Sequence, residues 1–270
     1  MRSIAEQVQD FASGRNRAGY KYRVDLIWHL VWRDFVLRYK GSVLGVLWSL
    51  LPPLAQLLVL VFLFGRVVPL NIEAYPAFVF CGLLPWIWFS TCLNSAGYLF
   101  ISNRDLVRRP HFNASTLVIT NILSNLLHLL LFLPILIVLL AIYNRGVTFN
   151  LLFLPLLIFI QLILTMGLGL MIATLNVFYH DVQQIVNVAL MLVFYLTPVF
   201  YSLQIIPERF QLIYRMNPIA LLVYNYRRVF FYGSIPDWEQ LLVSGGLSLV
   251  IFVLGCMVYL RGLNDIYDTV

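Results

Sequence analysis

The sequence PHFNASTLVITNILSNLLHLLLFLPILIVLLAIYN, residues 110–144, contains no Asp, Glu, Lys or Arg. A helix of about 20 apolar residues is long enough to cross the hydrocarbon layer of a bilayer, and this stretch is longer than that. Its length and lack of charge predict a membrane-spanning helix over about residues 113–143.

The rest of the chain repeats this pattern. Of its 270 residues, 61% are hydrophobic and 11% are charged, whereas an average soluble domain has about 25% charged residues. Too few polar groups remain to cover a water-exposed globule, which excludes a soluble protein. The other uncharged windows of spanning length are 41–65, 74–103, 146–180, 182–207 and 240–260. We therefore predict an all-α polytopic membrane protein with six spans, at about 43–64, 75–101, 113–143, 151–176, 182–201 and 241–260.

The distribution of Lys and Arg predicts the orientation of these spans. Twelve of the 18 Lys and Arg residues flank the spans on the side of the N-terminus, and six lie on the other side. Because positive residues concentrate on the cytoplasmic side, we expect both termini in the cytoplasm. The first forty residues are basic but contain no uninterrupted apolar stretch, so they do not have the pattern of a cleavable signal peptide.

We divide the chain into an N-terminal segment, 1–40, and a transmembrane domain, 41–270. Within residues 21–40, charged and apolar side chains alternate with helical spacing, and Trp28 and Trp32 lie beside cationic residues. This pattern predicts an amphipathic helix in the cytoplasmic headgroup layer, running directly into the first span. The alternative is a helix packed on a soluble partner. Pro52 and Pro53 are expected to kink or break the first span.

Residues 202–239, between the last two spans, are not an ordinary loop. The part from 219 to 232 is apolar and compatible with a helix, but it is too short to cross the bilayer. Asn217-Pro218 is a helix start signal and Gly233 a stop signal. We predict a re-entrant or interfacial helix here, preceded by a short helix around residues 208–215.

The segment between the second and third spans has its own helix signals. It reads Asn103-Arg104-Asp105-Leu106-Val107-Arg108-Arg109-Pro110. These residues predict one or two turns of helix, with an Asn cap at the start and a terminating proline at the end. The acid in the first turn and the bases in the last turn would complement the dipole of that helix. The predicted orientation places this helix on the cytoplasmic face.

Several chemistries are missing from the sequence. No GxxxxGK[ST] motif occurs, so the chain has no phosphate loop of its own, and any ATP hydrolysis belongs to a separate chain. Every Asp, Glu, Lys and Arg lies near a span end, which disfavours ion-coupled transport. His128 alone is deep, and with Asn121 and Asn125 at helical spacing it is interpreted as part of a polar stripe between helices.

Metal, disulfide and nucleic-acid readings are also disfavoured. The three cysteines, Cys81, Cys92 and Cys256, have no metal-ligand or CxxC spacing and are interpreted as small packing residues. The basic residues are dispersed along membrane boundaries rather than gathered in one groove. A membrane-embedded transferase would need a catalytic pair at the interface, and His180-Asp181 is a candidate. Capping and snorkelling explain that pair better.

The chain resembles the membrane permeases of ABC-2 type exporters, in the polysaccharide and O-antigen branch. The resemblance begins with Trp32 to Phe35, Arg38 to Ser42, Leu44-Gly45, Leu47-Trp48 and Pro52. It continues, in the order of the family and across nearly the entire chain, with Gly82 to Trp86, the 103–110 segment, Tyr179 to Val182, Thr197 to Tyr201 and Asn217-Pro218. The sequence departs from the family pattern at His180, where we expect an arginine.

This resemblance implies a homodimer of six-span subunits, served by two copies of a separate nucleotide-binding ATPase that holds ATP and Mg²⁺. No cofactor is expected in this chain. The complex would export a lipid-linked glycan through the cytoplasmic membrane of a bacterium, with membrane lipids and no nucleic acid as further partners. The resemblance also implies that 103–110 is the coupling helix, together with His180 and Asp181. It makes 21–40 the interface helix, and 208–216 and 218–232 the two gate helices.

The aromatic content, 15% of residues, suits a sliding glycan, because sugar rings stack on aromatic faces without one fixed hydrogen-bond pattern. The residues predicted to line the channel are Trp48, Phe194, Tyr195, Phe200 and Tyr201. Lipid-facing aromatic belts are the alternative for each of them. We assign Asn217, Pro218, Arg227 and Arg228 to the outer gate, where the two arginines would meet lipid phosphate or an anionic part of the substrate. Ordinary headgroup snorkelling is the alternative.

Three other functions stay open at this stage. An ABC-2 exporter of a drug or lipid would have the same architecture. A membrane-embedded glycan or acyl transferase would depend on His180 and Asp181. A non-transporting scaffold would tolerate replacement of Asp105, Arg108 and Arg109.

Overall fold

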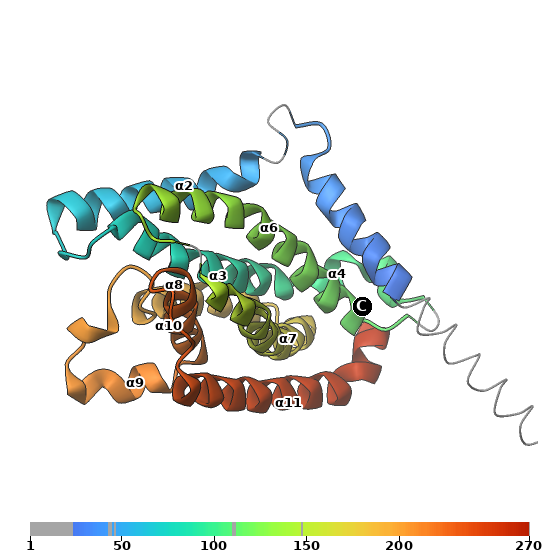
Figure 1. The fold of residues 1–270 in the computed structure, drawn as a ribbon. Helices are drawn as coiled ribbons and strands as arrows, with labels where there is room; N and C mark the ends of the chain where they lie inside the picture. The colour runs from blue at the N-terminus through green and yellow to red at the C-terminus, as the bar shows by residue number, and fades with distance from the viewer. Residues whose placement is uncertain (1–23, 43–44, 46, 110–111, 147, 270) are drawn as a thin grey trace, which may run out of the picture.

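The computed structural model describes residues 24–42, 45, 47–109, 112–146 and 148–269, and none of these residues is in a β-strand. The first described helix covers residues 24–39. It is followed by α2 (Leu47–Phe62), the π-helical η1 (Leu63–Val67), α3 (Tyr75–Ala96), α4 (Leu99–Ser102), α5 (Arg104–Val107), α6 (Ser115–Ile142), η2 (Phe149–Phe153), α7 (Leu154–Phe178), α8 (Val182–Leu196), η3 (Leu203–Ile205), η4 (Glu208–Phe210), α9 (Gln211–Arg215), α10 (Pro218–Phe230) and α11 (Trp238–Thr269) (Figure 1).

Five helices of the described residues are long and apolar enough to cross a membrane, and they correspond to five of the six predicted spans. They cover Leu47–Val67, Tyr75–Ala96, Ser115–Ile142, Phe149–Phe178 and Trp238–Leu263. The all-helical membrane architecture is therefore confirmed. The first span is not broken at the two prolines, because α2 continues through Pro52 and Pro53 and becomes irregular only later, in η1; the alternative of a kink there stays a prediction.

The segment predicted as the fifth span forms a shorter helix than expected. α8 has 15 residues, about 22 Å of helix, whereas the hydrocarbon layer is about 30 Å thick. The helix ends because Thr197 precedes Pro198, and a residue before proline is pushed out of the helical region. Thr197 indeed has extended backbone angles, φ −96° and ψ 133°.

Residues 182–200 nevertheless run the length of the central helix α3. Near the start of α8, the Gln183 side chain accepts a hydrogen bond from the backbone N–H of Gly97, at 2.8 Å. Beyond its end, the carbonyl of Phe200 accepts one from the Tyr75 hydroxyl, also at 2.8 Å. Tyr75 begins α3 and Gly97 follows its last residue. The short helix and the turn that follows it thus pass from one end of α3 to the other.

The two ends of the bundle carry different elements. Figure 1 shows α4 on the right, beside the end of α11 and the helix over residues 24–39, while α9 lies on the left. We call these the α5 end and the α9 end. Both the first and the last described residues lie at the α5 end.

α3 is the central helix. In its most apolar window 78% of the residues are buried, compared with 17–28% in the other four spans. A helix that is apolar on all sides belongs inside a bundle, and α3 is surrounded by α2, α6, α7, α8 and α10. The other spans therefore leave apolar faces for lipid or for a second protein.

α7 and α11 cross at a pair of glycines. A β-carbon on Gly255 would overlap the carbonyl oxygen of Gly167, and one on Gly167 would lie 2.5 Å from the Cα of Phe252. Gly169 sits against Val118 of α6, where a β-carbon would be 3.0 Å from a methyl group. Gly167 and Gly169 therefore permit close helix contact.

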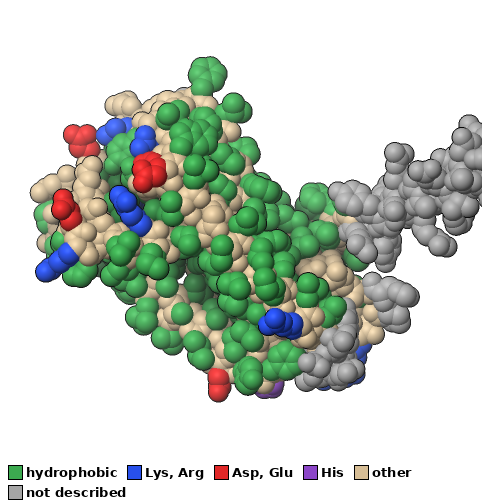
Figure 2. Space-filling model, turned by 90° about the horizontal axis from the view of Figure 1, so that it is seen from below, with side chains coloured by type: hydrophobic (Ala, Val, Ile, Leu, Met, Phe, Trp, Pro, Cys, Tyr) green, Lys and Arg blue, Asp and Glu red, His purple; other side chains and the backbone are tan. Residues whose placement is uncertain are grey.

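The surface of the bundle is apolar between its ends. In Figure 2 hydrophobic side chains cover the middle of the molecule, and most of the visible charged side chains lie toward the α9 end on the left. The exposed faces of α2 and α8 are examples, with Leu58, Phe62, Ile185, Met191 and Tyr195 at least half exposed. This distribution fits a protein whose middle is surrounded by lipid.

Candidate functional site

The 103–109 segment is a single short helix held by one apolar anchor. Val107 is fully buried among Phe100, Leu117 and Ile266. The side chains of Arg104, Asp105, Arg108 and Arg109 are exposed and form no hydrogen bond or ion pair within the described part of the chain. Four unpaired charged side chains therefore extend from a segment that the buried Val107 holds in place. Leu106 is half-buried.

One detail of this segment differs from the sequence prediction. The Asn103 side chain does not cap α5; its amide donates to the carbonyl of Leu99 at 2.9 Å and so closes the end of α4. Pro110 lies outside the described residues. The one turn of helix, Arg104–Val107, is present.

A buried junction connects the ends of α3 and α7 to the start of α8. It consists of Gly97, Asn176 and Gln183, which we call the Gly97 junction. The Asn176 amide donates to the Gly97 carbonyl at 2.9 Å, and the Gln183 backbone N–H donates to the Asn176 side-chain oxygen at 3.0 Å. With the Gln183–Gly97 bond, these contacts tie the ends of α3 and α7 to the first turn of α8. A side chain on Gly97 would collide with Gln183.

The Gly97 junction places the two predicted coupling loops at the same end of the bundle. Gly97 lies six residues before Asn103, and Gln183 lies two residues after Asp181. His180 and Asp181 are exposed, and the Asp181 carboxylate caps no backbone N–H of α8. The capping interpretation of Asp181 is therefore wrong. The exposed pair can meet a partner, as the 103–109 segment can.

A second polar cluster joins the helix over residues 24–39 to α6. Arg38 donates to the Asn125 side chain at 3.3 Å, and the Tyr39 hydroxyl lies 3.0 Å from Nδ1 of His128. Asn125 continues the network to Asn121, whose amide donates to the carbonyl of Cys92 on α3. The interpretation of His128 as part of a polar stripe between helices is confirmed.

The helix over residues 24–39 is amphipathic in the structure as well. Leu30 and Val31 are buried, whereas Trp28 and Trp32 are more than half exposed. Trp48, at the start of α2, lines a cavity of about 410 Å³ together with Arg38, Tyr39, Asn125 and His128. Trp48 therefore belongs to this α5-end cavity.

The other four predicted channel residues lie together near the α9 end. Ring centroids of Phe194 and Tyr195 are 5.4 Å apart, those of Phe194 and Phe200 5.8 Å, and those of Phe200 and Tyr201 4.9 Å. Phe64 stacks on Phe200 and Trp86 contacts Phe194, so two residues that the sequence analysis did not select complete this aromatic cluster. The structure thus separates Trp48 from the other four residues.

α10 is a buried helix between α3, α7 and α11, with ten of its 13 residues inside the protein. Its predicted signals are confirmed. The Asn217 side chain caps the first turn by accepting from Ala220 N–H, Pro218 occupies the first helical position, and Gly233 follows with a positive φ of 58°. Asn217 also donates to the Thr197 hydroxyl at 3.3 Å, which fixes α10 against the end of α8.

Arg227 and Arg228 have different environments. The Arg227 guanidinium is buried and donates to the carbonyls of Phe78, Val199 and Tyr201. It also lies 3.8 Å from the centre of the Phe78 ring. Burial lowers the pKa of Arg227 to about 10, so the group keeps its proton near neutral pH. Its donors join α10, α3 and the 197–201 segment and are therefore not available to lipid phosphate or substrate.

We expect Arg227→Lys to lower the stability of the protein by about 1–3 kcal/mol. A single ammonium group cannot reach three carbonyls in different directions, and each buried carbonyl left unpaired costs about that much. Thermal unfolding of the detergent-solubilised protein measures the change. Arg228→Lys is the matched control, because Arg228 is half-exposed and its loss should stay within about 0.5 kcal/mol. Equal unfolding midpoints for both variants would contradict the role of Arg227.

Comparison with known proteins decides the family. A profile of the ABC-2 type transporter family matches residues 25–231. The chain belongs to the ABC-2 type transporter family. It is 37% identical over 234 residues to the O-antigen export system permease protein RfbA of Myxococcus xanthus, covering 86% of this chain and 90% of that protein.

Two further relatives belong to the same kind of system. The O-antigen export system permease protein RfbA of Klebsiella pneumoniae is 30% identical, covering 88% of this chain and 92% of that protein. The polysialic acid transport protein KpsM of Escherichia coli is 24% identical, covering 90% and 95%. These ABC-2 relatives are named as permease and transport proteins, in agreement with the prediction of a transporter subunit rather than an enzyme.

The ABC-2 family match includes every residue that the sequence analysis assigned to coupling, channel or gate. What the sequence analysis missed is the Gly97 junction. The sequence places the side-chain amides of Asn176 and Gln183 within uncharged windows that were predicted to span the membrane. Such residues inside a membrane bundle usually form a hydrogen bond with another helix. That signal could have selected them, but their common partner Gly97 carries no side chain and gives no signal.

Proposed function

We propose that this ABC-2 permease is the membrane subunit of an ATP-driven exporter that moves a lipid-linked polysaccharide, an O-antigen or similar cell-surface glycan, across the cytoplasmic membrane of a bacterium. The relationship to two O-antigen permeases at 30–37% identity, over 86–88% of this chain, carries this proposal. The geometry described above agrees with it at each step of the path.

A separate subunit hydrolyses the ATP that drives export. The charged residues of the 103–109 segment have no partners within the described chain, and Val107 holds their base in the core. A docking ATPase that binds ATP and Mg²⁺ would pair Asp105, Arg108 and Arg109 with its own charges, two copies serving two permeases. The Gly97 junction would then pass movement from the end of α3, which leads into this segment, to α8, because its three hydrogen bonds join the ends of α3 and α7 to the first turn of α8.

The passage of residues 182–200 along α3 supports six membrane crossings. The turn at residues 197–200 carries the chain from the end of α8 to the Tyr75 end of α3, and its carbonyls face the protein rather than lipid, since that of Phe200 accepts from Tyr75 and that of Val199 from Arg227. Six crossings put both termini on one side, and the excess of Lys and Arg at that side assigns it to the cytoplasm.

A homodimer would give the glycan its channel. α2 and α8 expose apolar faces, and the aromatic cluster lies behind the α8 face, with Tyr195 61% exposed. Two copies meeting across these faces would enclose a path lined by aromatic rings, on which sugar faces can stack loosely while they move. Trp48 and the α5-end cavity lie at the entrance of such a path.

The test is to locate the glycan when this chain is deleted. With a sugar label, we expect lipid-linked glycan to build up in the cytoplasmic pool and to disappear from the surface, and the same result when the partner ATPase is inactivated. Plasmid-borne wild-type protein restores surface glycan in the control strain.

The alternatives give different results in the same experiment. Normal surface glycan in the deletion strain would point to a drug or lipid as the substrate. Failure to synthesise the glycan at all would indicate an enzyme. Either outcome contradicts the proposed function.

A further inference from the structure

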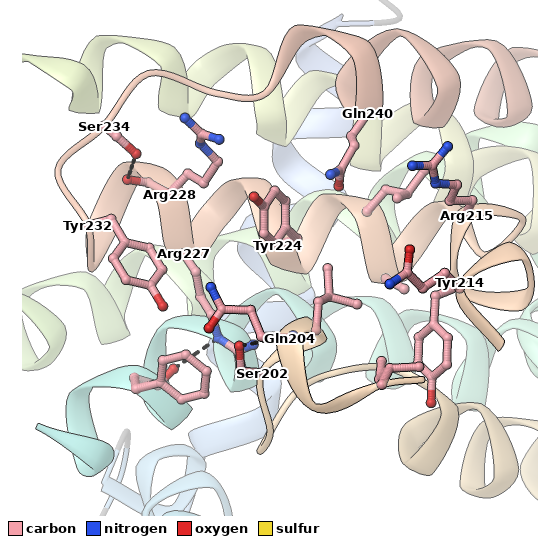
Figure 3. Close-up of a pocket in the computed structure, with 16 residues that line it drawn as sticks. Ser202, Gln204, Tyr214, Arg215, Tyr224, Arg227, Arg228, Tyr232, Ser234 and Gln240 are labelled. Atoms are coloured by element: carbon pink, nitrogen blue, oxygen red, sulfur yellow. Dashed lines mark hydrogen bonds between the residues drawn. The ribbon is translucent and has the colours of Figure 1, made fainter. Parts of the chain in front are cut away.

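A cavity of about 440 Å³ lies at the α9 end, apart from the aromatic cluster. Its walls come from the 202–215 segment, from α10 and from the start of α11, as Figure 3 shows. Sites for small molecules have volumes of roughly 300–1,000 Å³, so this cavity is large enough for one. Its lining includes the gate residues Arg227 and Arg228, but the proposed function gives the cavity itself no role.

The lining has the chemistry of a sugar site. Tyr214, Tyr224 and Tyr232 offer rings with polar tips, and glutamine and serine side chains lie between them. The polar members are Ser202, Gln204, Gln211, Ser234 and Gln240. Aromatic faces stack on the C–H faces of a sugar ring, and amides donate to and accept from its hydroxyl groups.

Several of these groups have no partner within the described chain. The side-chain oxygen of Gln240 is buried without a hydrogen bond, while its amide donates to Asp237 at 3.2 Å. In Figure 3 Gln240 extends from α11 into the space between Tyr224 and Arg215. A buried acceptor without a donor costs free energy, and a ligand hydroxyl placed there would remove that cost.

The charge of the cavity favours a ligand with an acidic group. Its lining includes Arg215 and Arg228 but no Asp or Glu. Arg228 donates to the carbonyl of Ile235 at 2.9 Å and lies 3.9 Å from the Asp237 carboxylate. Arg215 is exposed and has no hydrogen-bond or ionic partner among the described residues, so its guanidinium can form a two-pronged contact with a carboxylate.

We propose that this cavity binds one sugar unit that carries a carboxylate, with Arg215 on the acidic group, the tyrosines on the ring and Gln240 on a hydroxyl. The inference rests on the proposed function and names a feature of its substrate. Tyr214 links the cavity to the aromatic cluster, because its hydroxyl is 3.0 Å from that of Tyr201. A sugar that leaves the channel past Tyr201 would reach the cavity next.

Direct binding tests the site without transport. The full-length protein is purified into lipid nanodiscs, and its affinities for methyl glucuronide, methyl glucoside and inorganic phosphate are measured by ligand-observed NMR titration. We expect the glucuronide to bind about tenfold more tightly than the glucoside, since a charge-assisted contact is about that much stronger than none. Phosphate should bind no more tightly than the glucoside.

Two variants assign the contacts. Arg215→Gln should bring the glucuronide down to the affinity of the glucoside, and Tyr224→Phe should weaken both sugars about threefold. Arg209→Gln is the matched control, because Arg209 is exposed on the same segment but lies outside the cavity lining. It should leave both affinities unchanged.

Three results would overturn the inference. The first is equal affinity for both sugars in the wild-type protein, and the second is no binding of either sugar. The third is phosphate binding as tight as glucuronide binding, which would indicate a site for lipid headgroups. Because no ATPase or export is involved, these results are separate from a failure of the deletion experiment.

Discussion

Replacement of Gly255 by alanine is expected to remove most of the folded protein from the membrane. The β-carbon would overlap the carbonyl oxygen of Gly167, so the two backbones must separate before the side chain fits. Overpacking of a core costs about 1–3 kcal/mol and sometimes more, and backbone cannot rotate away as a side chain can. We expect a loss of about 3 kcal/mol or more, measured as the thermal unfolding midpoint and yield of the solubilised protein.

Gly246→Ala on the same helix is the matched control. A β-carbon on Gly246 meets nothing within 4 Å, and alanine favours a helix over glycine by about 1 kcal/mol. The two alanine variants should therefore change stability in opposite directions. A Gly255→Ala protein as stable as Gly246→Ala would show that α7 and α11 do not cross at these glycines.

The membrane spans could be predicted because they depend on a property that the sequence shows directly. A helix surrounded by lipid excludes charge along its whole length, so the uncharged windows located α2, α3, α6, α7 and α11 within a few residues. The start and stop of α10 followed from Asn217-Pro218 and Gly233, because caps and positive φ angles depend on local residue types.

The details that failed depend on contacts between distant residues. The end of α8 at Thr197-Pro198 is an exception, because a residue before proline is a local signal, and it was missed since the spans were assigned from the absence of charge alone. Arg227 and Arg228 are neighbours of one type, and only the three carbonyls around Arg227 distinguish them. Asn103 fits a cap for α5 by sequence, yet α4 already offered the Leu99 carbonyl.

The candidate site shows the same division. The exposure of the charged residues in the 103–109 segment could be predicted, because a short polar stretch between two long spans has to lie outside the membrane. The aromatic residues near the α9 end were readable as a set but not as a cluster, and Trp48 proved to belong to another cavity. The polar cavity behind Tyr214 was not predicted, because almost all of its lining lies within residues 202–240 but their sequence pattern does not show how α9, α10 and the start of α11 fold around one space.

Reversal of charge at Arg108 and Arg109, with glutamate at both positions, is expected to abolish glycan export while leaving a folded protein. Both side chains are exposed and unpaired in the described chain, so their replacement should change stability by no more than about 0.5 kcal/mol. An ATPase surface that attracts two guanidinium groups would instead repel two carboxylates, and like charges brought together at an interface cost several kcal/mol. The reconstituted complex should then hydrolyse ATP without moving glycan, or fail to assemble.

The matched control carries the same change in net charge at the other end of the bundle. Arg66→Glu with Arg209→Glu replaces two exposed arginines near the α9 end and should leave export unchanged. Because loss of positive charge can alter membrane orientation, accessibility of a cysteine introduced in the tail is measured in both variants. Unchanged export with reversed Arg108 and Arg109, in correctly oriented protein, would contradict the coupling assignment. The ATPase subunit would then have to dock elsewhere at the α5 end. The exposed pair His180-Asp181 is the next site at which to change the charge.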